Sequence, residues 1–165
     1  MPGVRCVNTG PGAVSEAGIL QINLDRSQAA QDLPTQTAVA MGASILLVSE
    51  PSRAGKQGNW LVDTRGDAAI LGTRNLTSNL TLGGRGEGFV WVRVGNTSVF
   101  SCYFSPNTLR QALEMRLDGL EEAVRAAGCR ILIAGDFNAK SPLWGSDRRD
   151  KRGEIVAKFL ARLDL

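Results

Sequence analysis

Several polar side chains come directly after short apolar runs in this sequence, and their types suit phosphate chemistry. Asp136 and Asn138 follow one such run two residues apart, so in extended chain the carboxylate and the amide would face the same way. Asn23 and Asp25 repeat this spacing after an earlier run, and Glu50 ends a third. Such oxygens suit a hard cation such as Mg²⁺ and its phosphate partners. The alternative is that Asp136 and Asn138 only form an Asx turn that closes a buried strand.

The 165 residues contain no histidine. This excludes zinc–histidine sites, Ser–His and Cys–His nucleophile pairs, and a histidine general base. Any catalysis would therefore use carboxylates, a metal ion or tyrosine. Tyr103 is the single tyrosine, and a Ser-Pro-Asn turn ending at Asn107 follows it closely.

The composition is that of one soluble globular domain, with 43% hydrophobic and 21% charged residues. A net charge of +3 fits a nucleic-acid partner without requiring one. The three cysteines are not closely paired, so neither a disulfide framework nor a zinc site is expected, and a reducing compartment is the default. No apolar run approaches the roughly 20 residues that span a bilayer, so no membrane partner is expected.

The polar side chains need strands that end at one edge of a sheet, where α/β proteins place their ligand sites. We expect strands over residues 19–24, 44–49, 60–63, 68–71, 88–94, 97–104 and 131–134. Residues 45–48 and 131–134 are apolar throughout, which predicts burial of these strands on both faces. Gly135 is expected to end the last strand with a turn, and Gly95-Asn96 predicts a hairpin.

Helical spacing of apolar residues predicts helices over 26–41, 109–127 and 154–163. In the first, Pro34 must kink the helix or start a second one. Thr108 and Gln111 form a candidate capping box for the second helix, whose apolar stripe begins at Leu109. Gly128 supplies the stop signal of that helix.

Five motifs occur in a fixed order: Gln-Ile-Asn23, Ser-Glu50-Pro, Tyr103-x-Ser-Pro-Asn107, Gly-Asp136-Phe-Asn138 and Trp144-Gly145. In this order they resemble the exonuclease-endonuclease-phosphatase superfamily. Gly-Asp-Phe-Asn-Ala, then Ser-Pro-x-Trp-Gly, then Arg152-Gly153 is most similar to the apurinic/apyrimidinic-endonuclease-like domain of site-specific non-LTR (LINE-type) retrotransposons.

The resemblance implies an α/β fold, the four-layer αββα sandwich of DNase-I-like proteins. Residues 1–17 would be a flexible leader, and residues 18–165 the N-terminal part of an endonuclease domain. The family has a Ser-Asp-His motif near its C-terminus and an earlier aspartate that orients the histidine. Neither motif is present here, so we expect the fold to be cut short at Leu165, which puts the activity of these residues alone in doubt.

The resemblance also implies a function: Mg²⁺-dependent nicking of one strand of double-stranded target DNA, with Mn²⁺ as an alternative ion. The 3′-hydroxyl left behind would prime a reverse transcriptase domain of the same polyprotein, in the nucleus. Glu50 would hold the metal with support from Asn23 and Asp25, and Asp136 would activate the attacking water. Tyr103 would contact the phosphate, and Asn138 would assist Asp136 at the phosphate. Asn107 would support the loop that carries Tyr103.

If DNA binds, the cations expected to contact its phosphates are Arg53, Lys56, Arg148, Arg149, Lys151 and Arg152. Trp144 is either a core residue or a side chain that reaches into a DNA groove. Two other functions stay open. One is a phosphatase or phosphodiesterase of the same superfamily acting on inositol phosphates or lipid headgroups, and the other is a catalytically silent nucleic-acid-binding module.

Overall fold

The structure is a computed structural model that describes residues 18–28, 32–52, 60–73, 80–128 and 130–165. The first sheet contains β1 (Gly18–Asn23), β2 (Ala43–Ser49), β3 (Leu61–Val62) and β4 (Ala68–Gly72). The second contains β5 (Thr81–Gly86), β6 (Phe89–Val94), β7 (Thr97–Tyr103) and β8 (Ile131–Asp136). The helices are α1 (Asp32–Ala40), α2 (Arg110–Ala127) and α3 (Lys151–Arg162), with a short 3₁₀ turn, η2, at Pro142–Trp144.

Each sheet has one pair of parallel strands at one of its edges. The first sheet has the order β1-β2-β4-β3, with β1 parallel to β2 and β4 antiparallel to its two neighbours. The second has the order β5-β6-β7-β8, with β8 parallel to β7 and the other pairs antiparallel. The parallel pairs β1–β2 and β7–β8 matter for function, because neighbouring parallel strands carry their carboxyl ends to the same edge.

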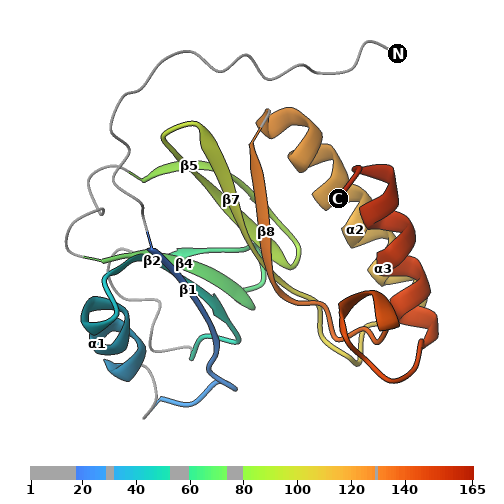
Figure 1. Cartoon of the computed structure of the whole chain (residues 1–165), viewed down its shortest axis with the longest axis horizontal. Coiled ribbons are helices and arrows are strands. Elements are labelled where there is room, and N and C mark those ends of the chain that lie inside the picture. The colour runs from blue at the N-terminus through green and yellow to red at the C-terminus, as the bar shows by residue number, and fades with distance from the viewer. Residues whose placement is uncertain (1–17, 29–31, 53–59, 74–79, 129) are drawn as a thin grey trace.

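Three hydrophobic clusters separate four layers of secondary structure (Figure 1). Ala38 of α1 packs against Leu46 and Val48 on the outer face of the first sheet. The inner faces of the two sheets meet in a second cluster made of Ile45, Leu47, Ile70, Val90, Val92 and Val99. Helices α2 and α3 cover the outer face of the second sheet through residues such as Leu117 and Phe159. The αββα layering expected from the sequence is therefore confirmed.

The two apolar strands that were expected to be buried on both faces differ in the structure. In β2 the residues from Ile45 to Val48 are fully buried and alternate between the helix side and the inter-sheet side. In β8, Leu132 is 38% exposed and most other residues are half-buried, so this prediction was wrong. The reason is that β8 is an edge strand, and an apolar run does not report whether a neighbouring strand exists.

The turn residues give mixed outcomes. The hairpin at Gly95-Asn96 is confirmed by the pairing of β6 with β7. Gly135 does not end its strand: it pairs with Cys102 inside β8, and a Cβ at Gly135 would overlap the Cys102 carbonyl oxygen. Close approach of two strands, and not a turn, therefore explains this glycine.

The observed helix ends differ in part from those predicted from the sequence. Helix α1 begins at Asp32, six residues later than expected, and Pro34 lies in its first turn, where a missing N–H costs little. The capping box was wrong, because α2 is preceded by Leu109, which is 79% exposed, and no side chain caps it. Gly128 does end α2, as predicted.

Strand β5 was missed, because its glycine-rich sequence lacks the alternation that marks a strand. No helix among the residues placed by the structure is long and apolar enough to cross a membrane.

Candidate active site at the strand ends

Four strand ends from the two sheets meet at one end of the sandwich. In the first sheet Asn23 pairs with Ser49, the residue before Glu50. In the second sheet Tyr103 pairs with Asp136. The cleft between them has a volume of about 470 Å³. All seven polar residues predicted for the centre of the site line this cleft: Asn23, Asp25, Glu50, Tyr103, Asn107, Asp136 and Asn138.

Hydrogen bonds cross the cleft from one sheet to the other. The hydroxyl of Tyr103 donates to Glu50 Oε1. The amide of Asn23 donates to Asp136 Oδ2 across 3.4 Å. These two contacts join all four strand ends, so the acids and amides form one centre although they lie far apart in the sequence.

Tyr103 is a hydrogen-bond donor in this centre. Burial raises the pKa of Tyr103 well above its usual range, and the hydrogen bond to Glu50 raises the pKa further. The phenol therefore stays protonated at neutral pH. A protonated phenol can donate to Glu50 or to a phosphate oxygen, but it cannot act as a base.

The backbone around the acids has an unusual conformation. Asp25, Glu50 and Asn138 have positive φ angles of 46°, 51° and 48°. Non-glycine residues adopt such angles rarely, and the positions where they do are concentrated at functional sites. These three residues turn the chain just after the strand ends, and all three line the cleft.

Asx turns are present beside the acids, as the simpler interpretation of the sequence proposed. Asp136 Oδ1 accepts from the backbone N–H of Asn138 at 3.0 Å. Asn23 Oδ1 accepts from the N–H of Asp25 at 2.8 Å. The chain at Asn138 is thus turned and not extended, and its side-chain amide donates to the Phe104 carbonyl at 3.2 Å. The turn and the cleft coexist, because Asp136 uses one oxygen for each.

Sequence reasoning missed Arg26, which also lines the cleft. Its guanidinium lies 2.7 Å from Asp67 and 4.0 Å from Glu50. The hydrogen bond to Asp67 holds the pKa of Arg26 above its ordinary value. The only signal in the sequence was its position directly after Asp25, since Asp67 is 41 residues away in the chain.

Asp63 was also missed, and its role is structural. It is buried, and its carboxylate accepts from the backbone N–H groups of Asp67, Ala68 and Gly88 at 2.6, 3.1 and 2.8 Å. It therefore joins the turn between β3 and β4 to the turn between β5 and β6. A buried carboxylate needs such donors, so the aspartate is explained without a catalytic role.

The oxygen donors of the cleft fit a hard divalent cation. Asn23, Asp25, Glu50 and Asp136 offer carboxylate and amide oxygens in one cleft. Within the part of the chain that the structure describes, no group of three or more acidic or cysteine side chains converges as a metal cluster. Mg²⁺ does not need one, since it keeps several waters and uses one or two carboxylates with substrate phosphates. Glu50 with Asn23 is such a donor set.

The predicted DNA contacts lie in several places around the cleft. Trp144 is 38% exposed, its Nε1 donates to the Ala139 carbonyl at 2.9 Å, and it lines an apolar hollow of about 930 Å³ beside β8. It is therefore not buried in the core. Arg148 lines a separate hollow with Lys140, and Arg149 is exposed. Arg53 and Lys56 lie outside the described residues.

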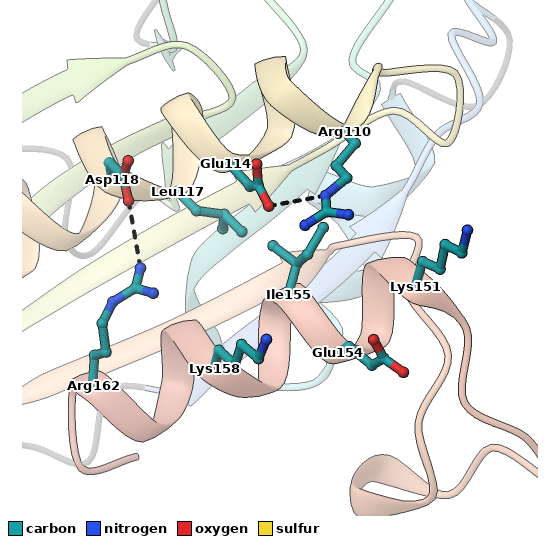
Figure 2. A pocket seen from close by; sticks show the side chains of 9 residues that line it. All are labelled: Arg110, Glu114, Leu117, Asp118, Lys151, Glu154, Ile155, Lys158 and Arg162. Carbon is teal, nitrogen blue, oxygen red and sulfur yellow. Dashed lines mark hydrogen bonds and ion pairs between the residues drawn. The ribbon is translucent and has the colours of Figure 1, made fainter.

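Lys151 lies at the start of α3 and faces a groove of about 380 Å³ between α2 and α3 (Figure 2). Charges of both signs line this groove, and two ion pairs cross or flank it: Arg110 with Glu114, and Arg162 with Asp118. Four cations and three acids line the groove, so it gives only weak net attraction for a phosphate backbone. Lys151 therefore lines this groove and not the strand-end cleft.

Arg152 differs from the other cations because its guanidinium is turned inward. It donates to four backbone carbonyls in the loops that follow β7 and β8. Burial lowers the pKa of Arg152, but a guanidinium stays charged under all ordinary conditions. Only one of its five N–H groups is left over for the phosphate contact that the sequence predicted.

Two packed sheets with helices outside and a polar cleft at the strand ends define a DNase-I-like α/β fold. Residues 97–165 match a family described as endonuclease-reverse transcriptase. The fold is similar to the solved endonuclease domain of TRAS1, a telomere-specific non-LTR retrotransposon, with a TM-score of 0.70 and 26% identity. The match covers 88% of this chain and 71% of that chain. No curated protein sequence matches. The expected fold and the resemblance to non-LTR retrotransposon endonucleases are confirmed.

Proposed function

We propose that this chain is a metal-dependent DNA endonuclease of a non-LTR retrotransposon, which nicks one strand of double-stranded target DNA. One observation carries the proposal: the seven polar residues from four strand ends share a single cleft. The similarity to the TRAS1 endonuclease domain supports a nuclease role for this cleft. Its natural substrate would be chromosomal DNA, so we place the protein in the nucleus.

The chemistry can be assigned to the residues on the two sides of the cleft. Asp136 would orient the attacking water and take its proton, since the carboxylate has an oxygen that faces the cleft. Tyr103 would donate a hydrogen bond toward the phosphate region, and Asn138 would hold the turn that carries Asp136. Asn107 would support the loop between Tyr103 and α2.

A divalent cation would be held by Glu50, with Asn23 and Asp25 in support. When bound, Mg²⁺ or Mn²⁺ supplies positive charge that stabilises the charge developing on the phosphate. Arg26 lies beside Glu50 and keeps that carboxylate oriented through its ion pair. Hydrolysis that breaks the P–O3′ bond would leave a 5′-phosphate on one side of the nick and a 3′-hydroxyl on the other. A reverse transcriptase domain of the same polyprotein would extend that 3′-hydroxyl.

DNA would lie across the cleft, with its backbone against the exposed cations near η2. Arg148, which shares a hollow with Lys140, and the exposed Arg149 follow η2 closely in the chain, and Trp144 is the last residue of η2. Such contacts position DNA without reading its sequence, and the affinity should fall as salt rises.

Nicking of supercoiled plasmid tests the proposal. The wild-type chain should convert supercoiled to open-circular DNA only when Mg²⁺ or Mn²⁺ is present. Asp136→Asn should lower the rate by about 1,000-fold. The matched control is Asp118→Asn, the same change on the exposed face of α2, which should nick like the wild type. Extension of the nick by a DNA polymerase checks the 3′-hydroxyl.

Because the Ser-Asp-His motif of the family is absent from these 165 residues, the natural protein that contains them is assayed as well. Failure of both to nick in either metal would contradict the proposal. DNA retention without cleavage would then favour a binding module. Release of phosphate from inositol phosphates or lipid headgroups, without activity on DNA, would favour the phosphatase alternative.

A further inference from the structure

The first turn of α3 is docked onto the chain that follows the Asp136–Asn138 turn. Asp150 caps the helix by accepting from Gly153 N at 2.6 Å, and it also accepts from Lys140 N at 3.1 Å. The Asp150 N–H in turn donates to the Lys140 carbonyl at 3.0 Å. A Cβ at Gly153 would overlap that carbonyl oxygen, so only glycine permits this approach. The helix start and the loop after β8 are therefore in backbone contact.

This contact places the Arg152 guanidinium among backbone carbonyls. Nε donates to the Asn138 carbonyl at 2.8 Å, and Nη2 donates to Phe137 at 3.1 Å. Nη2 also donates to Phe104 at 3.2 Å, and Nη1 donates to Thr108 at 3.1 Å. Four of its five N–H groups are used within the protein.

The four carbonyls belong to the two loops that carry the catalytic side chains. Phe137 and Asn138 form the turn after Asp136. Phe104 and Thr108 are on either side of the loop of residues 105–107, directly after Tyr103. The Phe104 carbonyl accepts a second hydrogen bond from the Asn138 side chain, and the Phe104 N–H donates to the Asp136 carbonyl at 2.9 Å. One guanidinium therefore ties the loop after β7 to the loop after β8.

We propose that Arg152 is a positioning residue of the endonuclease: it fixes the Asp136–Asn138 turn against the loop after Tyr103, and it does not contact DNA phosphate. The activity part of this inference rests on the proposed function. Lysine cannot replace Arg152, because an ammonium group has only three N–H donors on one nitrogen atom. The planar guanidinium has five donors on three nitrogen atoms and can bond several carbonyls at once. A small misplacement of Asp136 would slow the chemical step while leaving DNA affinity intact.

The test compares Arg152→Met and Arg152→Lys with two matched controls in the full chain. Arg152→Met should lower kcat for plasmid nicking by about 100-fold, with KM and the salt dependence of DNA binding unchanged. Arg152→Lys should recover only part of the lost rate. Arg149→Met removes an exposed cation of the same loop, so it should weaken DNA binding and lower the salt slope by about 1. Arg85→Met, on the opposite edge strand β5, should change none of these quantities.

Hydrogen exchange measured by NMR gives a readout that does not need activity. In the Arg152 variants the N–H groups of Asn138 and Phe104 should exchange faster, while Leu117 in α2 should exchange as in the wild type and so exclude global unfolding. Unchanged exchange at Asn138 and Phe104 would overturn the inference, even if the wild-type chain does not nick DNA. Weaker DNA binding with a lower salt slope and normal kcat would also overturn it, because that is the behaviour of a phosphate contact.

Discussion

The two sheets supply one cleft, but they hold their functional side chains in different ways. On the side of the first sheet, Asn23 and Asp25 are held by an Asx turn within three residues. The backbone of Glu50 is hydrogen-bonded to Asp67 and Arg26, and its carboxylate lies beside the Arg26 guanidinium and accepts from the Tyr103 hydroxyl. On the side of the second sheet, Asp136 and Asn138 are tied to the loop after β7 and to α3 by Arg152.

This difference separates backbone support from side-chain support. The first-sheet residues are placed by their own strand ends and by backbone hydrogen bonds between Glu50, Arg26 and Asp67, so side-chain changes elsewhere should affect them little. The second-sheet residues depend on a helix that begins 15 residues after Asp136. We therefore expect substitutions that disturb β8 or α3 to cost more than substitutions around Arg26.

The largest effect on stability is expected at Gly135, where a side chain on β8 would meet the backbone of β7. Gly135→Ala would push a Cβ into the Cys102 carbonyl at a φ of 145°, and should lower the free energy of unfolding by about 3 kcal/mol. Gly119→Ala is the matched control, because a Cβ there meets nothing within 4 Å on an α2 helix. It should raise the free energy of unfolding by up to about 1 kcal/mol. Urea unfolding measures both, and equal effects would contradict the packing.

Tyr103→Phe breaks one of the two hydrogen bonds that join the two sides of the cleft. The variant loses the hydroxyl that donates to Glu50, so the nicking rate should fall by about 100-fold. Its free energy of unfolding should change by only about 1 kcal/mol, the net contribution of one hydrogen bond. Single-turnover nicking and urea unfolding together make the check. A rate loss that follows only from unfolding would argue against a role for Tyr103 in the cleft.

Asp150→Ala tests the docking of α3 on the second-sheet side. Losing the helix cap should destabilise the protein by about 1 kcal/mol at neutral pH. Burial opposes ionisation of Asp150, but the N–H groups of Gly153 and Lys140 hold its pKa below the ordinary value. The stabilisation is therefore present at neutral pH and is lost as pH falls through the folded-state pKa. Thermal unfolding should show the gap between wild type and variant closing on acidification, and a constant gap would contradict this.

The smallest effect is expected at Arg26 on the first-sheet side. Its side chain is half exposed, so its ion pair with Asp67 is screened by water and salt. Arg26→Met should change the free energy of unfolding by less than about 1 kcal/mol, and less still at high salt. Urea unfolding at two salt concentrations would measure it, and a larger loss would show that the two sides of the cleft are supported alike.

The features that the sequence predicted are those that depend on nearby residues. The strand ends at Asn23, Glu50 and Asp136 follow apolar runs directly, and the hairpin at Gly95-Asn96 is set by its own turn. The convergence of these ends on one cleft follows from parallel pairing at the sheet edges.

Features that depend on distant partners could not be predicted. The exposure of Leu132 depends on whether another strand pairs with β8, which an apolar run does not show. The partners of Arg152 are 14 to 48 residues away, so its basic sequence surroundings suggested DNA and not backbone carbonyls. The contact between Arg26 and Asp67 was hidden for the same reason.

The central claim is that both sheets form one catalytic centre, and a double-mutant cycle tests it most directly. Single-turnover nicking would be measured for Glu50→Gln, for Asp136→Asn and for the double variant, with Asp118→Asn as control. Each single change should lower the rate by about 1,000-fold, and the double variant should be no slower than the slower single variant, because groups that act as a unit are not additive. Multiplication of the two losses, or normal nicking by either single variant, would contradict a shared centre.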